Sequence, residues 1–371
     1  MQRTLQTGLV WDERYMWYDF GSYTGLFDHH PHLQPGTSVE SPEAKRRIIN
    51  LLATSGLLAQ LRTLAPQAVG EGDLQRVHTA DYVATVKRLS SGGGGNAGPT
   101  APLPANGYDI AALAVGGTSR AIDAVLTGEV SNAYALVRPP GHHAERDHGM
   151  GLCVFANAAV AVKKAMAEHR LARVAIVDWD AHHGNGTESA FYHDPNVLTI
   201  SIHQDQIIHG RGFMEHRGVD QGAGYNINLP MPPGTGTGAY LAAFDRVVLP
   251  AIVRFKPDLI VVASGLDACS ADPTARLMLH SDGYRQLTQR MLQVADAVCG
   301  GRLVMTHEGG YDPTMVPFCA LAVFEELSGI RTAVVDPFLP PPPADTAVDY
   351  HALQPHQEVI IARAEELLAA L

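Results

Sequence analysis

The sequence predicts an α/β fold in which a mostly parallel sheet is covered by helices on both faces. Short apolar or β-branched runs alternate with longer segments of helical spacing, and the short runs lack the polar alternation of half-exposed strands. This alternation of strand and helix is typical of parallel sheets. The predicted strands are Tyr134–Val137, Val174–Val177, Val197–Ile202, Asn226–Leu229, Leu259–Ala263 and Leu303–Met305. The predicted helices between most of them are Ile110–Leu126, Ala156–Ala167, Tyr240–Phe255 and Tyr284–Val298.

The segments outside this pattern carry turn and capping signals. A helix is expected over Ser41–Leu58, with the serine as N-cap and Pro42 at the first helical position. The stretch Ser91–Gly107 is rich in Gly, Pro and Ala and is expected to be a loop, and since no Gly-Lys-Ser/Thr follows it, it does not predict a phosphate site. Pro340–Pro343 predicts a short spacer before a C-terminal helix at about Glu358–Leu368.

Length and composition are those of a folded protein with a large core. The chain has 371 residues, of which 46% are hydrophobic and 18% are charged. No linker or repeat divides it, so we expect one domain over residues 1–371, with its core at about 8–329 and the spacer and last helix in 330–371. A net charge of −11 argues against nucleic-acid binding. No stretch approaches about 20 apolar residues, which argues against a membrane span.

Cysteine usage and the N-terminal segment predict the compartment. The four cysteines are widely spaced and form no CxxC pair, so neither a disulfide framework nor a thiolate zinc site is indicated. The apolar run within Met1–Trp11 is too short for a signal-peptide core. We therefore expect a cytoplasmic protein. The stretch Asp28–His32 contains three histidines without fixed spacing, which indicates a rim or plain surface more than a metal site.

An acidic and histidine-rich segment follows the predicted strand Val174–Val177. Asp178 and Asp180 are two residues apart and leave the strand on one face, and His182 follows in the loop. The carboxyl edge of a parallel sheet is where such sheets build ligand sites. Two acids so close together repel each other unless a cation lies between them. Turn chemistry at a strand end is the alternative.

A second acid follows another buried strand, because Asp267 comes after Leu259–Ala263. Asp180, His182 and Asp267 supply two carboxylates and an imidazole, which leaves an open position on a tetrahedral metal and predicts a catalytic zinc site. Taken alone, Asp267 is equally consistent with a cap on the next helix.

Two further motifs follow predicted strands. His142 and His143 form a pair that suits general acid–base work near neutral pH, with Asp178 and Asn185 available to orient them. Gly309 and the glycine after it let the backbone approach a ligand closely, and the hydroxyl of Tyr311 can donate to a developing oxyanion. Packed histidines and a Gly-Gly turn with a packing tyrosine are the alternatives.

The four motifs RPPGHHA, DWDAHHGNG, SGLDA and EGGY, in this order, resemble the histone deacetylase family. The resemblance runs from about Gly8 to Gly329 and is closest to the class II branch and its bacterial histone-deacetylase-like amidohydrolases. It implies the arginase/deacetylase fold, with an open, mostly parallel sheet of about eight strands and one zinc ion at its carboxyl edge. It also implies a homo-oligomer, a dimer or a tetramer.

The resemblance assigns roles to individual residues. It makes Asp180, His182 and Asp267 the zinc ligands, His142 and His143 the catalytic histidines, and Tyr311 the group that polarises the carbonyl. Asp178 is implied to orient His142, and Asn185 to orient His143. Structural potassium is implied at two sites, one formed by Asp178, Asp180, His182, Ser201 and Ile202, and the other by Phe191, Asp194, Val197 and Tyr225.

The expected substrate wall departs from the family pattern. Leu152, after Gly151, stands where the family usually has Phe, Ile207 lies in the loop where a second Phe is expected, and Thr274 replaces a common Leu or Met. The stretch Ser91–Gly107 lacks the Asp that holds the substrate backbone in relatives and offers only two asparagines, Asn96 and Asn106. Gly151, Leu152, Ile207, Thr274 and Gly309 are the predicted substrate-binding residues.

The predicted reaction is zinc-assisted hydrolysis of an acyl amide, with acyl-lysine or a small acylated amine as substrate. An arginase-like ureohydrolase with two manganese ions is the enzymatic alternative, but it needs a second acid two residues after Asp267, where this chain has Cys269. A non-catalytic acyl-ligand sensor is the alternative from another class. Retention of both histidines and of Tyr311 argues against it.

Overall fold

A sheet of eight parallel strands lies at the centre of the computed structural model, which describes residues 6–21, 32, 36–208, 210–339, 349 and 351–368. The spatial order of the strands is β2-β1-β5-β10-β9-β6-β7-β8, and every pairing is parallel. The strands are β1 (Gly8–Val10), β2 (Arg62–Leu64), β5 (Ala133–Ala135), β6 (Val174–Asp178), β7 (Val197–Gln204), β8 (Asn226–Met231), β9 (Leu259–Ser264) and β10 (Leu303–His307).

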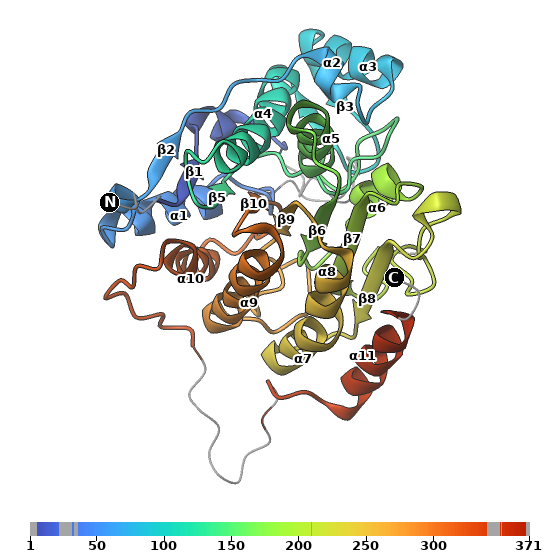
Figure 1. Ribbon diagram of the computed structural model, residues 1–371. Coiled ribbons are helices and arrows are strands. Elements are labelled where there is room, and N and C mark those ends of the chain that lie inside the picture. Colours follow the sequence, from blue (N-terminus) through green and yellow to red (C-terminus); the bar gives the residue numbers. More distant parts are fainter. Residues whose placement is uncertain are drawn as a thin grey trace.

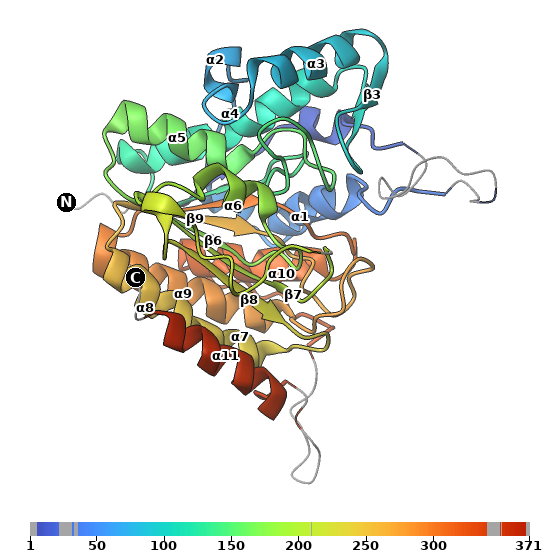
Figure 2. The ribbon, with the colours of Figure 1, turned by 90° about the vertical axis from the view of Figure 1, so that its right-hand side faces the viewer.

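Both faces of this sheet are covered by helices. Figure 1 shows α4 and α5 on one side of the strands and α8 and α9 on the other, and the turned view in Figure 2 shows α2, α3, α4 and α5 together above the sheet. The α-helices are α1 (Glu43–Thr54), α2 (Glu71–Leu74), α3 (Ala80–Ser91), α4 (Gly107–Leu126), α5 (Asn157–His169), α6 (Asn185–Phe191), α7 (Thr237–Ala243), α8 (Leu249–Phe255), α9 (Ser281–Cys299), α10 (Val316–Ser328) and α11 (Pro355–Leu367). The predicted parallel α/β fold is therefore confirmed.

Successive residues of the inner strands enter two different cores. Val174 and Ile176 of β6 pack into the core beneath α3, α4 and α5, whereas Ala175 and Val177 pack into the core beneath α7–α11. All four side chains are fully buried. This explains why the strand sequences are apolar without alternation: a strand covered on both faces has no solvent side.

Two local predictions are wrong, and one predicted helix is present but irregular. The first helix begins at Glu43, with Pro42 rather than Ser41 as the N-cap residue, and it ends at Thr54. The expected helix Tyr240–Phe255 is divided by a π-helical turn at Phe244–Val248, where each turn takes up one extra residue. The expected loop Ser91–Gly107 contains an antiparallel pair, β3 (Gly94–Asn96) with β4 (Pro102–Pro104).

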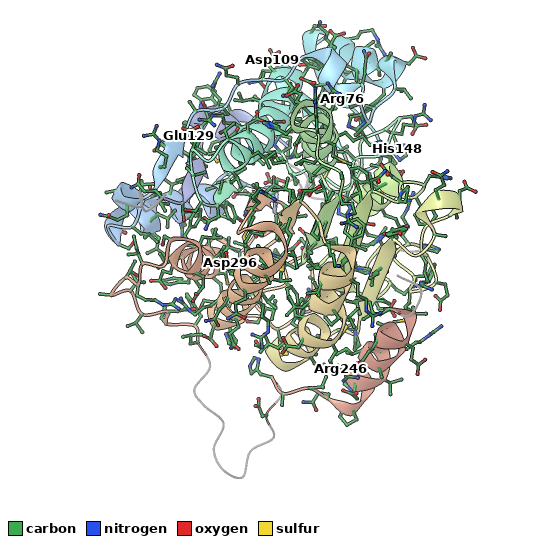
Figure 3. All side chains as sticks on the ribbon, viewed as in Figure 1. Arg76, Asp109, Glu129, His148, Arg246 and Asp296 are labelled. Carbon is green, nitrogen blue, oxygen red and sulfur yellow. The ribbon has the colours of Figure 1, made fainter. Side chains whose placement is uncertain are left out.

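The last helix packs onto the outer edge of the sheet beside β8. It is tied there by Arg246, whose guanidinium contacts Glu358 at 2.7 Å and Glu365 at 2.7 Å, and which lies at the outside of the molecule in Figure 3. Within the described part of the chain, no helix is long and apolar enough to cross a membrane. Pro340–Pro343 and 28–31 of the histidine-rich stretch lie outside the described residues.

The parallel arrangement brings four strand ends to one edge. β5, β10, β9 and β6 are neighbours in the sheet, and His307 pairs with Ser264 while Asp178 pairs with Ala263. The four motifs with catalytic residue types follow these four strands directly. The topology therefore gathers segments that lie up to about 170 residues apart in sequence.

Candidate metal centre and catalytic site

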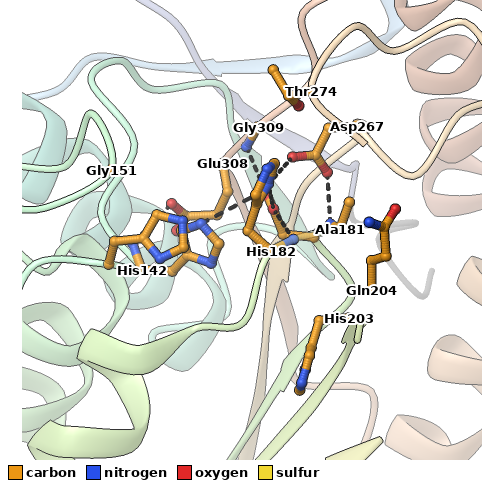
Figure 4. A network of polar contacts seen from close by, with 12 residues as sticks. His142, Gly151, Ala181, His182, His203, Gln204, Asp267, Thr274, Glu308 and Gly309 are labelled. Atoms are coloured by element: carbon orange, nitrogen blue, oxygen red, sulfur yellow. Dashed lines mark hydrogen bonds and ion pairs between the residues drawn. The ribbon is translucent and has the colours of Figure 1, made fainter. Parts of the chain in front are cut away.

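Asp180, His182 and Asp267 converge at this edge. His182 Nδ1 lies 3.1 Å from Asp180 Oδ1 and 2.9 Å from Asp267 Oδ2, and one donor atom from each of the three residues lies within 4.8 Å of the other two. Figure 4 shows the His182 ring close to Asp267, with His142 on its other side. Both carboxylates are fully buried, and His182 is half-buried.

Backbone amides hold the two carboxylates in place. Ala181 N–H donates to Asp267 Oδ1 at 2.8 Å, and Gly309 N–H donates to Asp180 Oδ2 at 2.7 Å. A Cβ atom at Gly309 would lie 2.2 Å from Asp267 Oδ2, so only glycine lets the backbone come this close. The glycine predicted for ligand approach therefore supports the carboxylates.

The donor set fits a divalent cation. Burial and the neighbouring Asp180 carboxylate raise the pKa of Asp267 well above its usual value, as expected where two buried acids lie close together. A buried carboxylate is costly unless it is paired or binds a metal. Two carboxylates and one imidazole are donors that zinc accepts in catalytic sites.

The tandem histidines lie beside this centre with their rings 3.9 Å apart. His142 Nδ1 is 2.9 Å from Asp178 Oδ2, and His143 Nδ1 is 2.7 Å from Asn185 Oδ1. Burial disfavours a charge on either ring. For His142 the Asp180 and Asp178 carboxylates outweigh burial and raise the pKa to about 10, whereas burial together with His142 lowers the pKa of His143 well below its usual value.

Tyr311 is held through its backbone and its ring. Its amide donates to Asp272 Oδ2 at 2.9 Å, and the ammonium of Lys45 lies 5.3 Å from the ring centroid. Burial and the Asp180 and Asp267 carboxylates raise the pKa of its hydroxyl well above 10. The phenol therefore keeps its proton at neutral pH and can act as a hydrogen-bond donor.

The predicted substrate-binding residues lie on four loops, of which the loop before α5 carries Gly151 and Leu152 and the loop after β7 carries Ile207. Gly151 N–H donates to Thr100 Oγ1 at 2.9 Å, and Leu152 N–H donates to the Thr100 carbonyl at 2.8 Å, so the β3–β4 segment holds this wall. Leu152 is buried in the core under α3–α5, and Ile207 packs partly against the opposite core.

The remaining predicted wall residue does not present a free side chain. The hydroxyl of Thr274 donates to Asp272 Oδ1 at 2.6 Å. The same carboxylate holds the amide of Tyr311, so Thr274 is linked to the candidate catalytic tyrosine through Asp272. Its role in substrate binding stays a prediction.

The residues expected to hold potassium lie on β6, α6 and β7, in the turns next to them and just before β8. Three of their carbonyls accept backbone hydrogen bonds: Phe191 from Asp194 at 2.9 Å, Asp194 from Val197 at 3.5 Å and Tyr225 from Thr199 at 3.0 Å. Ile202 is buried, and Ser201 Oγ lies 2.9 Å from His203 Nδ1. Potassium stays a prediction.

Sequence reasoning assigned no role to three buried acids of the site. The carboxylate of Glu308 accepts hydrogen bonds from the amides of Gly141 at 2.6 Å and of His142 at 3.1 Å. These two bonds fix the turn that carries the histidines. Burial raises the pKa of Glu308 to about 7. Asp272 holds Tyr311, and Glu145 accepts from Asn185. Of these three acids, only Glu308 could have been identified from the sequence, because it begins the EGGY motif.

A buried ionic network supports the histidine turn from behind. Arg138 donates to Glu40 Oε2 at 2.7 Å and to the carbonyls of Tyr15 and Tyr18 at 2.9 and 2.6 Å. Lys45 lies 2.8 Å from the other oxygen of Glu40. The side chains of these three charged residues are at most 1% exposed.

Arg138→Met is expected to lower the free energy of unfolding by about 3–5 kcal/mol, because it removes one partner of a buried ion pair and leaves backbone carbonyls without a donor. Urea unfolding followed by circular dichroism measures this loss. Arg14→Met, which breaks the exposed pair with Asp12, is the control and should cost less than about 1 kcal/mol. Equal losses in the two variants would contradict a stabilising network around Arg138.

Comparison with known proteins gives one consistent family. The model of the histone deacetylase domain matches residues 38–327. The chain is 48% identical over 338 residues to a histone deacetylase-like amidohydrolase of Pseudomonas aeruginosa, covering 90% of this chain and 89% of that protein. It is 36% identical over 292 residues to human polyamine deacetylase HDAC10, covering 75% of this chain and 43% of that protein.

A solved structure agrees with this assignment. The crystal structure of the HDA15 HD domain superposes with a TM-score of 0.85 at 30% identity, covering 98% of this chain and 94% of that chain. The predicted resemblance is thus confirmed at the level of family and fold. Because the family model spans most of the chain and the bacterial relative is nearly half identical along it, this chain belongs to the histone deacetylase family, whose members are amidohydrolases.

Proposed function

We propose that this protein is a zinc-dependent deacylase that removes an acetyl group from an acylated amine. The observation that carries the proposal is the convergence of Asp180, His182 and Asp267 beside two histidines and a protonated phenol at one sheet edge. The three residues would hold the ion. When bound, zinc would acidify a water molecule and polarise the substrate carbonyl.

The histidines are suited to different parts of the proton transfer. His143 donates from Nδ1 to Asn185, which leaves Nε2 as the atom that accepts the proton of the attacking water. His142, paired with Asp178, supplies positive charge next to the reacting groups. The tyrosine hydroxyl donates to the oxygen on which negative charge develops. The leaving amine then receives its proton from the histidine pair.

The arrangement disfavours the two-metal alternative. Cys269, at the position where an arginase-like site needs a second acid, is buried in the apolar core under α7–α11. The other triad of potential ligands within the described ranges is His142, Cys153 and Glu308, and in it Glu308 accepts two backbone amides. We therefore propose one zinc ion per chain. We also propose that the chain binds structural potassium.

We extend the proposal to a small acylated amine or an acyl-lysine side chain as substrate. A net charge of −11 suits a basic substrate, and the similarity to a human polyamine deacetylase favours testing acetylpolyamines first. Leu152 in place of an aromatic residue offers less stacking surface to a lysyl chain. A cytoplasmic location and a homo-oligomer remain predictions.

The test is a panel of acyl amides assayed with the zinc-loaded protein. Acetylpolyamines, an acetyl-lysine peptide and longer acyl-lysines are compared by amine release, and bound metals are counted by mass spectrometry. One zinc per chain with turnover of any of these amides supports the proposal. Two bound manganese ions, with urea release from a guanidino substrate added to the panel, would support the ureohydrolase, and zinc binding without turnover of any amide would support a sensor.

A further inference from the structure

A chain of polar contacts leads from the histidine pair to the protein surface. Asn185 receives the Nδ1 proton of His143 on Oδ1 at 2.7 Å, and its Nδ2 donates to Glu145 Oε1 at 2.8 Å. The same oxygen of Glu145 accepts from Arg211 Nη1, also at 2.8 Å. The chain therefore runs His143, Asn185, Glu145, Arg211.

Glu145 determines which way the Asn185 amide faces. Both protons on Nδ2 have acceptors, one being the Glu145 carboxylate and the other the backbone carbonyl of His143 at 3.2 Å. Turning the amide round would place its oxygen against these two oxygens and its NH₂ against His143 Nδ1. With the amide fixed as observed, Oδ1 faces His143 and selects the tautomer with hydrogen on Nδ1.

The position of Glu145 is itself well determined. His78 Nδ1 lies 2.9 Å from the Glu145 carbonyl, and the Glu145 amide donates to the carbonyl of His148 at 2.9 Å. His78 Nε2 accepts the amide of Ala156 at 3.0 Å, so its Nδ1 carries the proton and donates. The Glu145 side chain is 10% exposed, and a carboxylate so deeply placed needs a cationic partner.

Arg211 supplies this partner from a different part of the chain. It lies in the loop after β7 that also carries Ile207, and its side chain is 41% exposed. Of the ion pairs within the described residues, the contact with Arg211 is the one that involves Glu145. The loop next to the candidate substrate wall is therefore connected to the candidate general base.

We propose that Glu145 and Arg211 are positioning residues that hold Asn185 with its oxygen toward His143 and so keep Nε2 of His143 free to accept a proton. Neither side chain needs to touch the substrate. The inference rests on the proposed hydrolytic function for its kinetic consequence, but its structural content, the tautomer of His143, is independent of turnover.

The kinetic test compares Glu145→Ala, Arg211→Met and Arg211→Lys in the zinc-loaded protein. Glu145→Ala should lower kcat by about 10- to 100-fold, since a charge-assisted hydrogen bond is lost and one proton of Asn185 is left unpaired. Arg211→Met should lower kcat below that of the control, by up to about tenfold, Arg211→Lys should recover most of this loss, and KM should change by less than about twofold in each. Arg290→Met, which breaks the distant pair with Asp245, is the control and should leave both constants unchanged.

Nitrogen NMR of histidine-labelled protein tests the tautomer without any substrate. The His143 signals are identified by their loss in His143→Gln. Wild type should show hydrogen on Nδ1 alone, and Glu145→Ala should show a mixture of the two tautomers. An unchanged His143 tautomer in Glu145→Ala would overturn the inference. It would also be overturned if Glu145→Ala and Arg211→Met had the same kcat as the control Arg290→Met. Failure of wild type to cleave any amide would refute the proposed function, while the NMR result would still decide the inference.

Discussion

Asp267→Asn is expected to abolish zinc binding and to lower kcat by about 10³-fold or more. The amide keeps the size of the side chain and can still accept from the Ala181 amide, so the change is confined to charge and ligand strength. Asp180 and His182 would remain as a two-residue ligand set, which is short of the three protein ligands of catalytic zinc sites. A catalytic metal stabilises the transition state by several kcal/mol. Because about 1.4 kcal/mol corresponds to a tenfold change in rate, loss of the metal accounts for the expected drop in kcat of about 10³-fold.

Zinc-dependent stability gives a second measurement on the same variant. A ligand that binds only the folded state raises stability by about 2.7 kcal/mol at one hundred times its Kd. Wild type should therefore melt at a higher temperature when zinc is added, and Asp267→Asn should show no such shift. The zinc-free variant should melt no lower than zinc-free wild type, because it buries one acid fewer next to Asp180.

The control is Asp123→Asn, which changes an acid on α4 that pairs with His169 away from the site. It should bind one zinc and keep its activity. Full zinc content and normal turnover in Asp267→Asn would exclude Asp267 as a ligand and, with it, the proposed metal centre.

The metal-site residues could be predicted because they follow strands that are recognisable in the sequence. Buried strands such as Leu259–Ser264 are continuous apolar runs, and parallel strands bring their carboxyl ends to one edge. Asp180 and Asp267 therefore had to lie close together if the strands were neighbours. The sequence did not predict that β6 and β9 are neighbours, and this relation is seen in the sheet order.

The supporting contacts could not be predicted from the sequence. Arg138 meets Glu40 across 98 positions, and Arg211 meets Glu145 across 66, with no local pattern that pairs them. The three-residue strands β1 and β2 were missed because so short a run resembles a turn, and they become strands only through pairing with β5 and with each other. Such pairings depend on tertiary packing, which local propensity does not encode.

Tyr311→Phe is expected to lower kcat by about 10²- to 10³-fold while zinc content and stability stay close to those of wild type. The substitution removes only the hydroxyl, and the ring keeps its place because Asp272 holds the backbone amide and Lys45 lies over the ring face. Loss of a single donor to a developing oxyanion costs about this factor in hydrolytic enzymes. Since the donor acts mainly in the transition state, KM should change little.

A matched substitution separates the chemical role from the loss of a buried hydroxyl. Tyr284 is fully buried and its hydroxyl has no hydrogen-bond partner among the described residues, so Tyr284→Phe removes the same atom without breaking a hydrogen bond within that part of the chain. Its kcat should equal that of wild type. If Tyr311→Phe also turned over at the wild-type rate, the oxyanion would have to be stabilised by the metal centre and His142 without a further donor, because Lys45 is held by Glu40 and by the carbonyl of Gly310. The tyrosine would then have only a packing role.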